Sequence, residues 1–382
     1  MRLFSTAFLV FGVMVGCSSE DPFSELKQDA QQFQLERAAE MELIQEPDFL
    51  IGSYQTVNNI GSVAVDEAGR IFAVNRTRNR IEVYSAEGRP IQTLGKSGSD
   101  PGEFRQPELI KTDSRNLYAF DKSLQRINVF SLDDLNDISV LDLSANTLFE
   151  TDSAQKVIPF TFEVLGEGEL LTGFRITRTA TDQREVYYRM NLKPDESPDL
   201  RLSDAVFEFE GNGLYVDDTR TTTVIMELPY LEETLIAAGQ DSNLFMINTA
   251  EFLISKYDRE GNAAGAFYYP MKKQRLNKED VLNLYTNVHY RRAIRGADLP
   301  DTWPAVAKMF VDDKGRIWIA TITEGLEKYR WYLLDKAGNP VGTFNLQRKQ
   351  TIEAVHNNFI YIKRYNPNSY SLEIRRFYFV QK

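Results

Sequence analysis

An eight-residue pattern occurs twice in this chain, as V-D-E-A-G-R-I-F at 65–72 and as V-D-D-K-G-R-I-W at 311–318. Each copy has the form of a strand end, a tight turn and the start of the next strand. Aspartate begins such a turn through its side-chain oxygen, and glycine supplies the positive φ that the turn needs. Because the copies lie 246 positions apart, they indicate an array of a repeated β unit.

A second pattern gives the length of the repeat. R-I-E-V-Y-S at 80–85 returns as R-I-N-V-F-S at 126–131, a spacing of 46 residues. Apolar and polar residues alternate in both copies, as they do in a strand of a sheet with two different faces. Because this repeat length is typical of the blades of a β-propeller, we predict an all-β fold of that kind.

Six such units can be counted, at 61–95, 108–143, 160–190, from 233 onward, at 307–346 and at 351–380. The last unit has room for only three strands, and a ring left open there would expose a sheet edge. An apolar segment at 49–52 precedes the first unit and belongs to no unit of its own. We therefore expect it to complete the sixth blade, so that strands from both termini close the ring.

The first unit carries further motifs, N-R-I-E-V-Y at 79–84 and P-G-E-F at 101–104. Together with V-D-x-x-G-x-I, they resemble an NHL repeat. The whole chain resembles the six-bladed β-propeller lipoproteins of the Bacteroidota, with the NHL/TolB-like fold. The resemblance implies the fold but says little about function, since propellers serve as lyases, lactonases, scaffolds and sensors.

Residues 1–16 have the features of a lipoprotein signal peptide. Arg2 precedes an apolar run at 3–15, which is too short to span a bilayer and is typical of a secretion signal. The run ends in Gly16-Cys17, which resembles the lipobox of bacterial lipoproteins and implies cleavage before Cys17 and its acylation. The alternative is an ordinary signal peptide. Cys17 is the only cysteine of the chain, and it stands where the lipid is expected.

The acidic stretch after this cysteine predicts a tether. Between residues 18 and 46 there are eight Asp and Glu residues against two Lys and Arg residues. We expect residues 17–46 to be an acidic tether, partly helical from Ser24 to about Met41. Residues 47–382 are then the propeller, which we expect to be a monomer.

The lipid on Cys17 is the expected attachment to the membrane. It places the protein in the cell envelope, at the outer membrane, on the periplasmic or the surface face. Glu20-Asp21 resembles the surface-export signals of Bacteroidota lipoproteins. The net charge of −11 argues against nucleic acid as a partner, because phosphate binding needs clustered Lys and Arg.

Two insertions, at about 203–232 and 271–304, interrupt the regular spacing of the units. In the second one, Asn277 followed by acidic residues predicts the start of a helix. Long loops on a rigid ring are where binding usually occurs. The candidate ligand-binding residues of this insertion are His289, Arg291, Arg292, Arg295 and Trp303.

The chemistry of these residues suits an anionic or carbohydrate ligand. The guanidinium fork of arginine binds carboxylate or phosphate, and tryptophan stacks on sugars or peptide groups. The alternative is a basic loop that pairs with the acidic body of the protein. We assign no catalytic residue and no metal ligand, because the chain has two histidines and neither an HExxH nor a GxSxG motif.

Two functions follow from this pattern. The first is a lipid-anchored envelope propeller that binds a ligand or an envelope protein without catalysis and without a cofactor. The alternative is a hydrolase or lactonase of the six-bladed propeller type with an axial calcium ion, which needs six to eight oxygen ligands. Several carboxylates or imidazoles converging at one mouth of the channel would distinguish the second function from the first.

Overall fold

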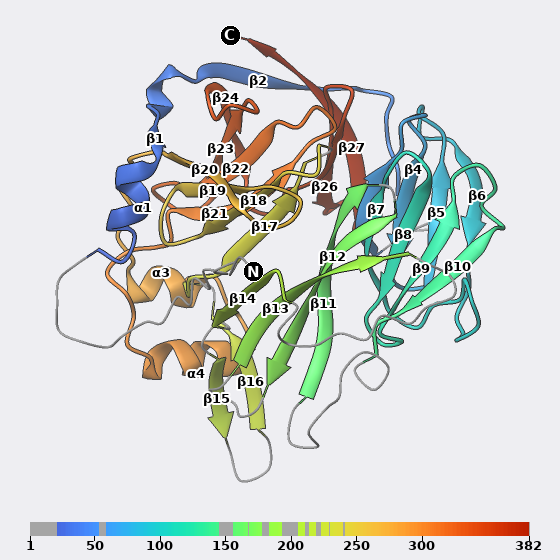
Figure 1. The fold of residues 1–382 in the computed structure, drawn as a ribbon, viewed down its shortest axis with the longest axis horizontal. Helices are drawn as coiled ribbons and strands as arrows, with labels where there is room; N and C mark the ends of the chain where they lie inside the picture. Colours follow the sequence, from blue (N-terminus) through green and yellow to red (C-terminus); the bar gives the residue numbers. More distant parts are fainter. Residues whose placement is uncertain are drawn as a thin grey trace, which may run out of the picture.

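The computed structural model describes residues 21–52, 59–144, 156–166, 168–177, 183–192, 205–210, 214–218, 223–228, 230–239 and 241–381. The predicted signal peptide and Cys17 lie outside these residues. Most of the described chain is in strands, and the helices are few and short (Figure 1). No helix of the described part is long and apolar enough to cross a membrane.

The strands of the described residues form six four-stranded blades. Blades one to three contain β3 (Ile60–Val65), β4 (Ile71–Asn75), β5 (Arg80–Tyr84) and β6 (Pro90–Leu94); β7 (Pro107–Thr112), β8 (Asn116–Asp121), β9 (Arg126–Ser131) and β10 (Ile138–Asp142); and β11 (Lys156–Gly166), β12 (Glu169–Thr177), β13 (Gln183–Asn191) and β14 (Phe207–Glu210).

Blades four to six contain β17 (Thr234–Ala238), β18 (Leu244–Asn248), β19 (Leu253–Tyr257) and β20 (Ala263–Tyr268); β21 (Val306–Val311), β22 (Ile317–Ile322), β23 (Lys328–Leu334) and β24 (Pro340–Gln347); and β25 (Thr351–His356), β26 (Phe359–Asn366), β27 (Ser371–Gln381) and β2 (Ala39–Gln45). The first strand of most blades contacts the first strand of the next, around a central axis. The prediction of a six-bladed β-propeller closed by strands from both termini is confirmed.

The strand that closes the ring differs from the predicted one. β2 pairs with β27 in antiparallel register from Met41↔Gln381 to Gln45↔Phe377. The segment predicted for this role, 49–52, makes only an isolated bridge between Ile51 and Ile374. Phe49 and Ile51 are buried in the cluster between blades six and one, so the apolar character that suggested a strand serves interblade packing instead.

The expected tether is also different in structure. Helix α1 (Ser24–Asp29) ends twelve residues before Met41, and the chain continues through β1 (Gln31–Gln32), the 3-10 turn η1 (Leu35–Arg37) and β2. β1 pairs with β20, η1 contacts β24, and β2 pairs with β27. This segment, residues 21–45, follows the outer edges of blades four, five and six (Figure 1). Strand edges offer backbone hydrogen bonds along its length, and these bonds replace the expected helix.

The repeated turn has the predicted chemistry. The Asp66 carboxylate accepts hydrogen bonds from the Arg70 backbone N–H at 2.7 Å and from Arg70 Nε at 2.6 Å. Asp312 makes the same two contacts with Arg316, at 2.9 and 2.7 Å. The glycine at the fourth position of each turn has a positive φ, 79° at Gly69 and 71° at Gly315.

The first insertion is shorter than predicted. β14, which we assigned to it, is the outer strand of blade three and pairs with β13. The remaining described part is a hairpin of β15 (Leu214–Asp218) and β16 (Thr223–Glu227). β14 lies beyond 160–190, the range counted as the third unit, and it therefore fell within the predicted insertion.

Candidate functional site

The second insertion contains two short helices that pack against one end of blade five. We call residues 271–304 the cap. Helix α3 (Lys278–Asn283) begins as predicted, because the Asn277 side chain accepts a hydrogen bond from the Glu279 backbone N–H. Helix α4 (Val288–Gly296) has the same kind of start at Asn287. The β15–β16 hairpin lies beside α4 (Figure 1).

An apolar cluster fixes the cap to blade five. The buried residues of this cluster come from both helices, from the end of the first insertion and from β22, and they are Leu228, Tyr230, Leu276, Val281, Leu282, Ala293, Ile294, Trp303 and Ile322. Leu326 and Tyr329 of blade five pack against it. Burial on this scale makes the cap a part of the folded body rather than a free loop.

Two of the predicted binding residues stabilise the cap from inside. Trp303 is only 1% exposed, and the Arg348 guanidinium lies 5.9 Å from its ring centroid. Arg291 Nη1 donates to the backbone carbonyls of Leu282 and Tyr285 at the end of α3. Both side chains therefore make contacts within the protein: Trp303 lies in the apolar cluster, and the half-buried Arg291 binds the end of α3, which differs from the predicted orientation toward a ligand.

The other three predicted residues lie on α4. Arg292 and Arg295 are exposed, and His289 is half-buried. His289 and Arg292 both have interaction partners within the protein. The five predicted residues therefore do not converge on a single ligand-binding surface.

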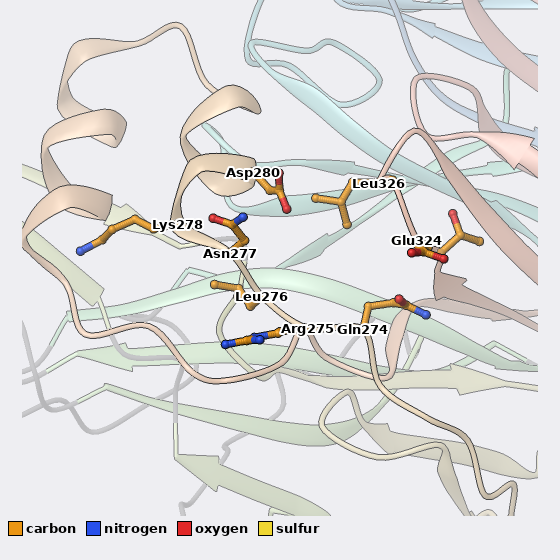
Figure 2. Close-up of a pocket in the computed structure, with 10 residues that line it drawn as sticks. Gln274, Arg275, Leu276, Asn277, Lys278, Asp280, Glu324 and Leu326 are labelled. Carbon is orange, nitrogen blue, oxygen red and sulfur yellow. The ribbon is translucent and has the colours of Figure 1, made fainter.

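A hollow of about 570 Å³ lies between the start of the cap and the β22–β23 loop. Its lining residues are Gln274, Arg275, Leu276, Asn277, Lys278, Asp280, Thr323, Glu324, Gly325 and Leu326. Figure 2 shows Arg275, Asn277 and Asp280 on one side of it and Glu324 and Leu326 on the other. A second hollow of about 280 Å³ adjoins it and shares Arg275, Leu276 and Lys278.

The polar groups of the hollow differ in what they already bind. Lys278 Nζ donates to the carbonyls of Arg295 and Ala297, at 2.9 and 3.3 Å, and in Figure 2 it points away from the hollow. The exposed Arg275 guanidinium has no hydrogen bond or ion pair with the described residues. Asp280 is also exposed, and Glu324 lies across from it. One cation and two carboxylates thus remain for a ligand.

Sequence reasoning missed this hollow. Arg275 and Asp280 lie in the predicted insertion, but the predicted binding residues were those of the arginine-rich stretch of α4 and Trp303. Glu324 lies in the short loop between the second and third strands of blade five, outside both predicted insertions. Only the fold brings these two segments together, since Glu324 lies 44 positions after Asp280 and α4, β21 and β22 stand between them in the chain.

The inner strands carry charged pairs around the central axis. Lys111 on β7 and Glu163 on β11 form an ion pair of 2.5 Å between blades two and three. Glu353 on β25 pairs with Lys363 on β26 at 2.7 Å. These pairs neutralise charges that would otherwise be costly to desolvate.

Lys308 on β21 is the perturbed group of this region. Burial lowers the pKa of its amine below the ordinary value, and the positive charges of Lys363 and Arg348 lower it further, while Glu353 opposes them. A similar effect acts under the cap, where burial raises the pKa of Tyr285. In both groups burial disfavours the charged form.

The predicted axial calcium ion lacks a visible set of ligands in the described part of the chain. There, no group of three or more His, Cys, Asp and Glu side chains converges as a metal site would need. The calcium ion and the hydrolase function that depends on it stay predictions without a residue set of their own.

Fold and topology together define this chain as a six-bladed β-propeller with a helical cap on one end. A family model, described as a 6-bladed beta-propeller, matches residues 48–197. No curated protein gave a match.

Solved structures of other propellers resemble the whole chain. A protein from Bacteroides fragilis NCTC 9343 that is inferred to be exported has a TM-score of 0.50 and 13% identity, covering 92% of this chain and 99% of its own. A DUF4221 family member from Bacteroides vulgatus ATCC 8482 has a TM-score of 0.49 and 12% identity, covering 91% and 100%. The calcium-binding protein regucalcin from Agrobacterium tumefaciens C58 has a TM-score of 0.41 and 10% identity, covering 91% and 95%. At these identities the likeness concerns the fold alone.

Proposed function

We propose that this protein is a lipid-anchored β-propeller of the cell envelope that binds a polar ligand without catalysis, in the hollow between the cap and the β22–β23 loop. The lipobox-like residues at Cys17 support the anchor. The similar protein from Bacteroides fragilis is also inferred to be exported, which agrees with an envelope location.

The observation that carries the binding role is the unpaired set of polar groups in the hollow. The Arg275 guanidinium suits a carboxylate or a phosphate, which it can bind with two parallel hydrogen bonds. Asp280 and Glu324 can accept hydrogen bonds from hydroxyl groups of the same ligand. An acidic oligosaccharide has both kinds of group, so it is the ligand class that we propose.

The anchor is tested by replacing Cys17 with serine. We expect the Cys17→Ser protein to move from the membrane fraction to the soluble fraction, because stable attachment by acylation needs the modified cysteine. The measurement is cell fractionation with carbonate and high-salt washes. Wild-type-like retention of the variant after both washes would mean that something other than this lipid holds the protein.

The ligand site is tested with Arg275→Ala on an array of oligosaccharides that contain carboxylate groups. Loss of a hydrogen-bonded charge pair corresponds to roughly 10- to 100-fold weaker binding. The melting temperature is expected to stay nearly constant, because an exposed arginine contributes little to stability.

Lys336→Ala is the matched control, since Lys336 is an exposed cation in the β23–β24 turn, at the other end of blade five. Its binding is expected to equal that of the wild type. Equal binding by Arg275→Ala and the wild type would show that the ligand does not bind in the hollow.

A further inference from the structure

The first described residues are fixed beside the cap. The Asp21 carboxylate accepts a hydrogen bond from Lys27 Nζ at 2.7 Å. Lys27 forms an ion pair of 3.1 Å with Glu251, and Glu251 forms another of 3.0 Å with Lys273. Lys273 is one of the first residues of the cap, so this network ties the start of the described chain to the base of the cap.

Asp21, the cap and the hollow lie at the same end of the blades. Glu251 lies between β18 and β19, the second and third strands of blade four. The β22–β23 loop that lines the hollow holds the same position in blade five. Because all blades run in the same sense around the axis, these loops share one face of the propeller. We call it the cap face.

The short segment between Cys17 and Asp21 limits the distance between the cap face and a lipid on Cys17. Four positions separate Cys17 from Asp21, and four fully extended residues span at most about 14 Å. We propose that the cap face of the propeller lies against the membrane and that the cap contacts a surface of anionic phospholipids. This inference rests on the proposed anchor for its geometry.

The charge of the cap complements such a surface. Residues 271–304 contain seven Lys and Arg residues against four Asp and Glu residues, a formal charge of +3 in a chain of net charge −11. Lys272 and Arg295 are exposed. Each basic residue near an anionic bilayer surface adds attraction, so the cap suits such a surface better than the acidic chain as a whole.

Apolar side chains at the tip of the cap strengthen the argument. Leu284 and Val288 flank the connection between α3 and α4, and they are 40% and 67% exposed. Basic residues together with exposed apolar residues on a short helical segment are typical of contact with the headgroup layer. The ligand of the hollow would then be drawn from the layer next to the membrane.

The orientation is measured on vesicles with the propeller held at its natural attachment point. The chain from residue 17, with Cys17→Ser, carries a hexahistidine tag directly before this residue and binds to nickel-chelating lipid. Because Cys17 is the only cysteine, Val288→Cys or Ala337→Cys gives a single site for a fluorophore, at the cap or at the exposed β23–β24 turn of the opposite face. We expect stronger energy transfer to headgroup-labelled lipid from position 288 than from position 337.

The lipid preference is measured without the tag, by partition onto phosphatidylglycerol and phosphatidylcholine vesicles at low salt. The double variant Lys272→Gln/Arg295→Gln is expected to bind the anionic vesicles about thirtyfold more weakly than the wild type. Lys314→Gln/Lys336→Gln, which removes two exposed cations from the opposite face, is the matched control and is expected to leave the partition unchanged.

Equal energy transfer from the two labels, or equal effects of the two double variants, would overturn the inference. These vesicle experiments need no acylated cysteine, so their outcome is independent of the fractionation of Cys17→Ser. If Cys17→Ser is released from the membrane while the vesicles show no preference, then the anchor is right and the docking face is wrong.

Discussion

Deletion of residues 21–45 is expected to abolish the cooperative unfolding of the propeller. The deletion removes β2 and leaves the edge of β27 without its partner over the five paired positions from 41 to 45. Met41 and Leu43 also pack against the cluster between blades five and six, and truncating a core side chain of this size costs about 2–5 kcal/mol when it is fully buried. Urea unfolding followed by circular dichroism and by tryptophan fluorescence is the measurement.

A point variant separates the loss of packing from the loss of the strand itself. Leu43→Ala is expected to lower the midpoint of unfolding while keeping a single transition. Glu42→Ala, at the exposed neighbouring position, is the control and should change the midpoint little. A deleted protein with the same midpoint and slope as the full chain would show that β2 does not close the ring.

Asp312→Ala is expected to lower the free energy of unfolding by about 3–5 kcal/mol. The Asp312 carboxylate is buried and accepts hydrogen bonds from Arg316 Nε at 2.7 Å and from Trp318 Nε1 at 2.8 Å. Trp318 is fully buried and stacks on Phe310 and Phe379. The Asp312 side chain thus connects Arg316, just before β22, to Trp318 in the core between blades five and six.

The first copy of the turn is a matched control for this effect. Asp66 makes the same contacts with Arg70, but Phe72 stands where blade five has Trp318. Asp312→Ala should therefore cost more than Asp66→Ala, by about 1–3 kcal/mol for the indole N–H left unpaired. A double-mutant cycle of Asp312→Ala with Trp318→Phe measures the coupling directly. Additive losses in the cycle would show that the indole contact adds nothing to the turn.

The two copies of the turn show how far local sequence reaches. V-D-x-x-G-R-I requires only neighbours within the same hairpin, so its turn and its aspartate contacts could be predicted from composition and spacing. The same holds for Asn277, whose side chain caps α3 through a residue two positions away.

The choice of the closing strand shows where local sequence fails. Two segments, 49–52 and Met41–Leu43, contain apolar residues and precede the first blade by a short distance in the sequence. Met41 and Leu43 alternate with Glu40 and Glu42, which is the better strand pattern, but the acidic residues favoured a tether. The position of the free β27 edge decides between the two segments, and that edge exists only after blade six has folded.

By itself, the sequence determined the all-β class, the repeat and the number of blades, because the residues that form each hairpin are consecutive in the chain. It also identified the cap as an insertion that begins with a helix. Only the tertiary structure decided that Trp303 is buried, that Arg291 caps a helix end and that Arg275 and Glu324 line the same hollow. These outcomes depend on contacts between segments far apart in the chain, and the burial of apolar surface, which selects them, is a property of the assembled blades.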